Sequence, residues 1–334
     1  MNATILSPRS FGVLFLFLTV CAAESFSQQY QSLDHNLVST FSIVGCDTLA
    51  GEAGVAVASR FFAVGTVVPW ARADIGAIAT QSFANTSYGW RGLDLLGSGK
   101  TPEQVKEIFM QSDSEFQKRQ FGIVAADGNS TTFTGKECLS WAGGRSGRTY
   151  AVQGNILTGE PVVAAMESVF LKTKGTLADR LYAALCAGDQ QGGDSRGRQS
   201  AALIVVKKNA GYGGFNDKAI DIRVDDHPDP FRELGRLLNY AQMNYSWNEA
   251  WTFFTHKQFE RALPCMERTA LLAPENPEVL YDLTVIRTAA GKISGALEAL
   301  EKALMLNPKL KQQASADGDL NVLKPEAKFR ELVK

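Results

Sequence analysis

The chain has few of the residues that most often mark a catalytic or metal site. It contains three histidines, His35, His227 and His256, and five cysteines at long and irregular spacings. That spacing contains no zinc pattern of the C-x-x-C kind. A Ser-His-Asp hydrolase would have to use His227, because His35 falls in the expected leader and His256 in the expected helical region. We therefore favour chemistry that needs no histidine, metal or cofactor.

The chain also lacks an excess of charge of either sign. Thirty-four Lys and Arg residues face 35 Asp and Glu residues, which leaves a net charge of −1. Such a chain has no general attraction for nucleic acid or for an anionic membrane. We expect no nucleic-acid partner.

Long hydrophobic runs are absent apart from Phe11 to Ala23, which follows the single basic residue Arg9. This run is too short to span a bilayer comfortably and precedes small residues suited to cleavage. It predicts a signal peptide over residues 1–27, cut between about 23 and 27, a leader over 28–39 and no integral membrane span. A retained anchor and a lipoprotein signal are the alternatives. Export would leave the mature chain periplasmic or extracellular, with its cysteines as free thiols or one disulfide, of which we favour free thiols.

Small residues crowd the stretch Gly51 to Gln81, which is nearly free of charge. Repeated Gly and Ala let the backbone approach another layer or a ligand closely. This stretch is therefore either tightly packed core or the wall of a site.

Hydrophobic patterning predicts strands and helices in a non-alternating order. A capping box at Thr101 to Gln104 and an N-cap at Asp229 predict two helix starts. The predicted strands are 40–46, 54–59, 75–81, 120–126, 130–135, 200–207 and 219–224. The predicted helices are 101–112, 161–172, 177–187 and 231–241. Strands at both ends with helices grouped between them predict an α+β layered domain.

A different composition begins beyond Asn244, with helix-forming residues that repeat every 34 positions. Ala262 matches Ala296 and Pro274 matches Pro308 at this spacing. The period resembles that of tetratricopeptide repeats, and a plain helical hairpin is the alternative. We expect about two repeats and a capping helix within residues 245–334, which could bind a protein partner.

The densest polar cluster is the glycine-rich segment 192–200. Arg196 and Arg198 could bind a carboxylate or phosphate, with Asp194 orienting one of them. The structural alternative is a buried Arg–Asp pair that fixes the loop. The carboxylates around His227, among them Asp225, could hold a metal. We favour a structural role, because two prolines stiffen this strand-to-helix connection and Asp229 is explained as an N-cap.

Thr40 opens the first predicted strand and is a candidate nucleophile. Its hydroxyl could be activated by its own α-amine, whose ordinary pKa is about 8. This needs cleavage of the peptide bond before Thr40. Otherwise Thr40 is an ordinary strand residue.

Ten ordered blocks of the sequence resemble the family known as domain of unknown function 1028. They are TFSIVGCD, GEAGVAVASRFFAVGTVVPWARADIGAIATQ, YGWRGLDLL, TPEQV, RQFGIVAADG, TGKECLSWAG, QGNILTG, GGDSRGRQSAALIVVKK, GYGG and VDDHPDPFRELGRLL. The resemblance covers residues 40–242 and implies a four-layer αββα sandwich like that of N-terminal-nucleophile (Ntn) hydrolases. It also implies a nucleophile at Thr40. The chain departs from proteasome-like Ntn enzymes at Ala58, where an acid would precede the Ser59-Arg60 pair.

The resemblance implies an exported Ntn amidohydrolase that acts on a small amide or peptide-like substrate. Thr40 would be the nucleophile, and Ser59, Arg60, Asp194 and Arg198 would form the site wall. The alternative is a catalytically inactive Ntn-like protein of the cell envelope that binds a ligand or a partner.

Overall fold

The structure is a computed structural model that describes residues 37–38 and 40–334. The expected signal peptide and nearly all of the expected leader lie outside the described residues. Val38–Lys334 form one compact unit. Within the described part of the chain, no helix combines the length and the apolar character that a membrane span needs.

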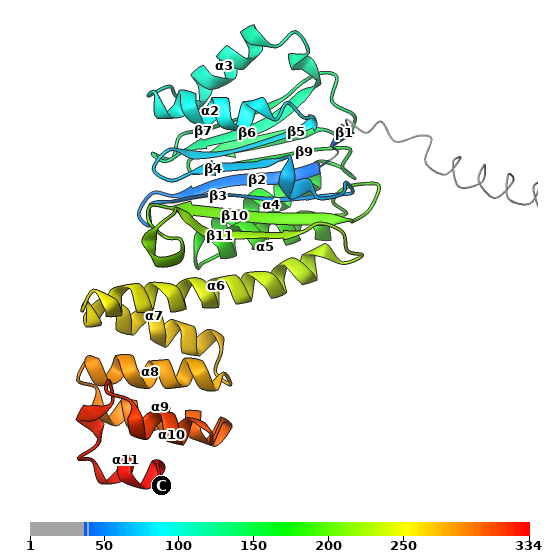
Figure 1. The fold of residues 1–334 in the computed structure, drawn as a ribbon. Helices are drawn as coiled ribbons and strands as arrows, with labels where there is room; N and C mark the ends of the chain where they lie inside the picture. The colour runs from blue at the N-terminus through cyan, green and yellow to red at the C-terminus, as the bar shows by residue number, and fades with distance from the viewer. Residues whose placement is uncertain (1–36, 39) are drawn as a thin grey trace, which may run out of the picture. The chain divides into compact units, whose positions relative to one another are not determined.

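Six strands form an antiparallel sheet, called here the first sheet, in the order β11-β10-β3-β2-β9-β8 (Figure 1). Its strands are β2 (Thr40–Asp47), β3 (Glu52–Ser59), β8 (Gly143–Gly147), β9 (Tyr150–Asn155), β10 (Ser200–Lys207) and β11 (Lys218–Val224). The sequence predicted four of these strands and missed β8 and β9.

A second antiparallel sheet packs against the first. In it β4 (Pro69–Arg72) and β6 (Arg119–Ala125) pair with β5 (Gly76–Phe83), and β7 (Ser130–Thr134) pairs with β6. The strand β1 (Leu37–Val38) precedes them in the chain. Apolar side chains from both sheets form a shared buried cluster that includes Val44, Val55, Ala79 and Val124. Burial of this layer supplies the main force that holds the two sheets together.

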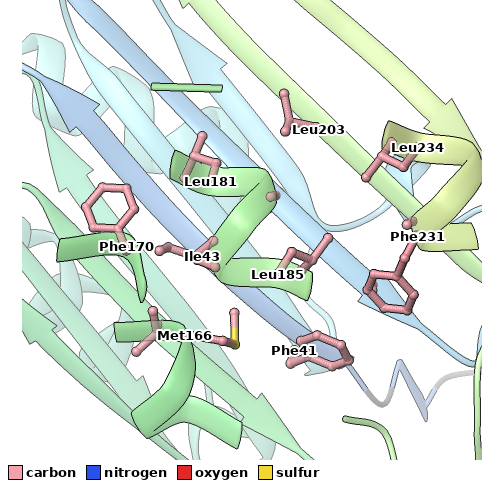
Figure 2. Packing of buried hydrophobic residues seen from close by; sticks show 14 of the residues in the cluster. Phe41, Ile43, Met166, Phe170, Leu181, Leu185, Leu203, Phe231 and Leu234 are labelled. Carbon is pink, nitrogen blue, oxygen red and sulfur yellow. The ribbon is translucent and has the colours of Figure 1, made fainter. Parts of the chain in front are cut away.

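Helices cover the outer face of each sheet. The second sheet is covered by α2 (Ser87–Gly97) and α3 (Pro102–Ser112), whose Tyr88 and Phe109 pack on Phe121. The first sheet is covered by α4 (Glu160–Lys172) and α5 (Leu177–Gln190). Figure 2 shows Leu181 and Leu185 of α5 beside Ile43 of β2. The predicted capping box at Thr101 is confirmed, since Thr101 and Gln104 bond each other's backbone N–H groups.

One long helix, α6 (Pro230–Thr255), joins the sheets to the C-terminal helices. Its predicted N-cap is confirmed, because the Asp229 side chain accepts a hydrogen bond from the Arg232 N–H. The helix runs 14 residues past the predicted end at residue 241. Leu234 and Leu238 pack in the core of the first sheet, while Ala250 packs among the C-terminal helices. A division of the chain at residues 242 to 245 stays a prediction.

Five further helices complete a C-terminal helical region. They are α7 (Phe259–Leu272), α8 (Pro277–Ala289), α9 (Ile293–Leu306), α10 (Leu310–Ala316) and α11 (Ala327–Leu332). α9 begins and ends 34 positions after α7 does. The chain is therefore a mixed α and β protein, with two antiparallel sheets followed by helices. Four single turns of 3-10 helix lie in the connections: η1 (Val64–Thr66), η2 (Phe116–Lys118), η3 (Tyr212–Gly214) and η4 (Asn321–Leu323).

Tight packing explains much of the small-residue stretch Gly51 to Gln81. A Cβ on Gly54 would lie 2.5 Å from the main-chain oxygen of Ile204, so the residue must be small where β3 meets β10. A Cβ on Gly65 would lie 2.6 Å from the side chain of Ala202. Apart from Ser59 and Gln81, which belong to the site described below, this stretch is chiefly tightly packed core.

The cysteines of the described chain are free thiols, as the sequence analysis favoured. Cys46 is buried between the sheets, and burial raises the pKa of its thiol to about 11. A thiol with such a pKa is almost wholly protonated at neutral pH and is a poor nucleophile.

Candidate functional site

The interface between the two sheets changes from apolar to polar along the strands. In β2, successive inward-facing residues are Thr40, Ser42, Val44 and Cys46, all buried. Alternation places every second residue of a strand on one face, so Thr40 faces the second sheet as Val44 does. The polar end of this interface is the candidate site, and its members share full burial and a polar side chain. They are Thr40, Ser42, Ser59, Gln81, Gln120, Gln153, Asn155 and Ser200.

Four of these residues form a closed ring that joins the two sheets. Nε2 of Gln81 donates to the main-chain oxygen of Thr40 at 3.1 Å and to Oε1 of Gln120 at 2.9 Å. The same Oε1 of Gln120 accepts a hydrogen bond of 2.9 Å from Nδ2 of Asn155. Asn155 is in turn the cross-strand partner of Thr40 in the first sheet. We call these four residues the amide ring.

A second set of bonds supports the amide ring from the side of Ser42. Oγ of Ser42 donates to Oε1 of Gln81 at 2.5 Å and accepts from Nε2 of Gln153 at 2.7 Å. Thr132 donates to Oε1 of Gln153 at 3.2 Å. The side chains that form these hydrogen bonds are amides and hydroxyls, so the amide ring and its support are uncharged.

Two non-glycine residues with left-handed backbone conformations adjoin the amide ring. Ser82, with a φ of 66°, directly follows Gln81, and Ile156, with a φ of 52°, directly follows Asn155. A β-branched residue such as isoleucine rarely adopts this conformation, which costs about 1 to 3 kcal/mol. Ile156 is held there by hydrogen bonds of its backbone with Leu139 and Ser195.

Ser59 lies next to Thr40 at the same end of the first sheet. Phe41 pairs with Ala58, so the ladder places Thr40 and Ser59 at adjacent positions on β2 and β3. Ser59 pairs in turn with Ser200. Ser200 is fixed by bonds to the segment after β3, because its Oγ donates to the Phe61 oxygen at 2.5 Å.

Asp194 is buried and orients one of the two arginines of the loop. The arginine that it orients is Arg196 and not Arg198. The Asp194 carboxylate accepts from Nη2 of Arg196 at 2.8 Å and from the N–H of Arg60 at 3.0 Å. Asp194 therefore ties the loop of residues 192–200 to the end of β3, which agrees with the structural alternative drawn from the sequence. Arg60 itself is exposed and donates to the main-chain oxygen of Arg196.

Arg198 is held by a different acid. Nε and Nη2 of Arg198 both bond to Asp189 at 2.7 Å, and the guanidinium lies 5.7 Å from the ring centre of Phe231. These residues line a cavity of about 120 Å³ together with Phe41 and Ser59. Phe41 faces the helices, so this cavity lies chiefly on the other face of the first sheet from the Thr40 side chain.

The structure thus places the five residues expected at the site at one end of the first sheet, but not on one face. Thr40 faces the second sheet, and Asp194 and Arg198 line the cavity on the helical side. Ser59 lies beside Thr40 and also lines that cavity, whereas Arg60 is exposed. The backbone N–H groups of Gly192, Gly193 and Gly197, in the loop of residues 192–200, donate hydrogen bonds to main-chain oxygens of the protein. Gly193, for example, donates to the Gly188 oxygen.

The sequence analysis missed Gln81, Gln120, Gln153 and Asn155. Each lies at an inward position of a strand that is otherwise apolar or small, as in the segments GAIATQ, RQFGIVA and YAVQGN. The sequence could have indicated them, because each is a polar residue at a strand position where the alternation of the strand predicts a buried side chain.

Other arrangements of catalytic groups find little support in the described residues. The letters Gly193-Asp194-Ser195-Arg196-Gly197 fit G-x-S-x-G, but they lie in a helix-to-strand loop and not on a strand-to-helix turn. Nδ1 of His227 accepts the N–H of Asp229 at 3.0 Å, which is a role in the helix start. No group of three or more potential metal ligands occurs among the residues that the structure describes.

The chain is a layered α+β domain. It has two packed antiparallel sheets and a buried polar site at one end of the interface between them. The family of unknown function DUF1028 matches residues 40–234, and the chain belongs to that family. The match begins at Thr40. No protein with a curated function matches the chain.

A solved structure agrees with this assignment. The crystal structure of protein SPO2555 from Silicibacter pomeroyi, a DUF1028 protein, is similar with a TM-score of 0.55 and 30% identity. The similarity covers 61% of this chain and 89% of that one. The structure of MamA 41-end from Desulfovibrio magneticus RS-1 matches 30% of this chain and 63% of that chain with 20% identity. Its TM-score is 0.24, which is too low to support any inference about this chain.

Proposed function

We propose that the protein is an exported N-terminal-nucleophile hydrolase that cleaves a small amide or peptide-like substrate. Two sheets with helices on both outer faces support a four-layer αββα sandwich of the Ntn type. Thr40 is the first residue of β2 and the first residue of the family match. The expected signal peptide motivates the proposed export.

The proposed reaction uses Thr40 alone for nucleophile and base. After cleavage of the bond before Thr40, its Oγ attacks the substrate carbonyl carbon while its α-amine accepts the hydroxyl proton. The amine then gives this proton to the leaving amine, and an acyl ester remains on Thr40. Water hydrolyses the ester by the same route, which releases the acid and regenerates the hydroxyl.

The observation that carries this proposal is the uncharged character of the amide ring and of the groups that support it. The side chains that form these hydrogen bonds are glutamine, asparagine, serine and threonine. None of these groups can accept a proton near neutral pH. An α-amine, with an ordinary pKa of about 8, can do so and would belong to the nucleophile itself.

The proposal is tested by the state of residue 40 in secreted protein. The protein is expressed with its own signal peptide and purified after secretion, and its N-terminus is determined by mass spectrometry. It is then treated with a β-lactone probe that acylates activated hydroxyls. We expect a chain that starts at Thr40 and one acyl group on Thr40. Thr40→Ala should abolish the label, while Thr80→Ala, which removes a buried hydroxyl elsewhere, should retain it. An unlabelled protein that starts near residue 24 to 28 would reject the proposal.

A second candidate function is supported by the burial of Thr40. Its exposed fraction is 0% in the described chain, which fits a residue that reacts with nothing. On this account the domain binds a ligand or an envelope partner, and the C-terminal helices act as tetratricopeptide-like repeats. The 34-residue offset between α7 and α9 supports such repeats. This function would survive Thr40→Ala and be lost when the helical region is disrupted, and the opposite pair of results would reject it.

A further inference from the structure

A threonine at a chain end needs something to hold it in place. Once the bond before it is cut, Thr40 loses its covalent tether on the N-terminal side, and terminal residues fray unless they are tied down. Its amine, hydroxyl and substrate must nevertheless keep a fixed geometry, since a misplacement of about 1 Å can cost about 100-fold in rate. The structure therefore needs a second attachment for this residue.

The main-chain oxygen of Thr40 provides that attachment. It accepts the hydrogen bond from Nε2 of Gln81, which comes from the opposite sheet. Gln81 is itself fixed by Gln120 on one side and by Ser42 on the other. The direction of the Thr40 main chain is thus set by a side chain that scission would leave untouched.

The rest of the molecule gives the Gln81 side chain little freedom. Gln81 has an exposed fraction of 0%, and the strained conformation of Ser82 follows it directly. Gly122 lacks a side chain on the adjacent strand, and this leaves room for Gln153 beside the amide ring. Such strain persists only where its surroundings enforce it, and it gathers at functional sites.

The amide ring is not required for the two sheets to pack together. At their other ends the same two sheets pack through Val44, Val55 and Ala79, so these strands can be joined without polar groups. Burying amides costs free energy unless they are hydrogen-bonded, and hydrogen bonds between buried side chains restrict their motion. A rigid attachment at residue 40 is the use that this location offers.

We propose that Gln81 is a positioning residue for Thr40: it holds the main chain of Thr40 so that the free amine and the hydroxyl keep their reactive arrangement. This inference rests on the proposed function. Gln81 touches neither substrate nor reacting atoms in this account and acts only through the Thr40 carbonyl.

The test compares substitutions of two buried glutamines in the processed protein. Gln81→Met keeps size and loses the donor to Thr40, and Gln81→Asn keeps an amide that is one methylene too short to reach. Gln242→Met is the control, because Gln242 is also a buried glutamine and its side chain bonds to Asp179 and Arg268, outside the candidate site. For each variant, the N-terminus, the urea midpoint and the rate of β-lactone labelling are measured over a range of probe concentrations.

We expect both Gln81 variants to start at Thr40 and to have a limiting labelling rate about 100-fold below the wild type. The half-saturating probe concentration should not change. Gln242→Met should lose stability through its own broken hydrogen bonds and label within a few-fold of the wild type. Equal limiting rates in the Gln81 and Gln242 variants, or a change confined to half-saturation, would overturn the positioning role. A wild type that neither starts at Thr40 nor takes the label would instead defeat the proposed function, and the positioning role with it.

Discussion

Gly122 leaves the space that the side chain of Gln153 occupies. A Cβ on residue 122 would lie 2.2 Å from Oε1 of Gln153, although the two residues belong to different sheets. This contact couples a glycine of β6 to the hydrogen bonds that support the amide ring, because Gln153 also bonds to Ser42.

Gly122→Ala should therefore destabilise the protein and disturb the site. The added methyl group forces Gln153 out of its place, and overpacking of this kind costs about 1 to 3 kcal/mol. Urea unfolding followed by circular dichroism measures the change.

Gly97→Ala is the control for the change at residue 122, because a Cβ there meets only ordinary contact with Ile75 at 3.5 Å. Its stability should stay the same or rise by up to about 1 kcal/mol, as expected for alanine in a helix. A Gly122→Ala protein as stable as the wild type would contradict the described packing between the sheets.

Asp113→Asn should lower stability at neutral pH. Burial alone would raise the pKa of Asp113, but hydrogen bonds from Arg119, Tyr88 and the Glu115 N–H outweigh it and hold the pKa far below its usual range. Side chains of Asp113 and Arg119 are only 11% and 13% exposed, so loss of the charge leaves Arg119 paired with Glu115, whose side chain is 50% exposed. We expect a loss of about 3 kcal/mol at pH 7, the lower end of the range for a broken buried pair.

The same pair predicts a pH dependence. A carboxyl with a depressed folded-state pKa stabilises the fold above its unfolded pKa, about 3.9, and this contribution is lost as the pH falls further. The gap between the wild type and Asp113→Asn should thus narrow below about pH 4. Asp94→Asn, which breaks the exposed pair with Arg72, should change stability by less than about 1 kcal/mol at any pH. Equal effects of the two substitutions at pH 7 would refute this account.

Asp282 predicts the opposite pH dependence in the helical region. Oδ2 of Asp282 accepts hydrogen bonds of 2.7 Å from the indole nitrogens of both Trp247 and Trp251. Burial raises its pKa, the indole bonds lower it, and the carboxylates of Glu278 and Asp317 raise it, with a net upward shift. Because the folded pKa lies above the unfolded one, the fold gains stability as the pH falls through the folded pKa.

Asp282→Asn should consequently be more stable than the wild type at pH 7, because it keeps an acceptor for the indoles and removes a buried charge. That advantage should shrink as the pH is lowered. Asp282→Leu removes the acceptor and should cost about 1 to 3 kcal/mol for each buried indole N–H left unpaired. Thermal unfolding of the wild type and the two variants between pH 4 and 8 measures these differences in stability. An asparagine variant less stable than the wild type at pH 7 would contradict the predicted cost of the buried charge.

Local signals in the sequence predicted those parts of the fold that local interactions dictate. The capping box at Thr101, the N-cap at Asp229 and the strand Ser200–Lys207 agree with the structure because each depends on neighbouring residues. The strand β9 was missed, because its sequence YAVQGN contains Gly154 and Asn155, which strands usually avoid. Helix α6 was predicted too short because its second half packs against the C-terminal helices rather than against the first sheet.

The candidate site was predictable only in part. Thr40 follows from the chemistry of a terminal amine and from the family resemblance, and Ser59 lies next to it as a partner in the ladder. The amide ring could not be assembled from the sequence, because register across two sheets brings Gln81, Gln120 and Asn155 together from three strands. Arg196 and Arg198 were assigned to one cluster by proximity in sequence, whereas the structure gives them separate acids, Asp194 and Asp189.

The most direct measurement is the identity of the first residue of the working protein, combined with the site of β-lactone labelling. The account predicts a mature chain whose N-terminal residue is Thr40 and whose label is found on that residue. A secreted and functional protein in which Ser39 is still joined to Thr40 would contradict it, because the hydroxyl would then have no base.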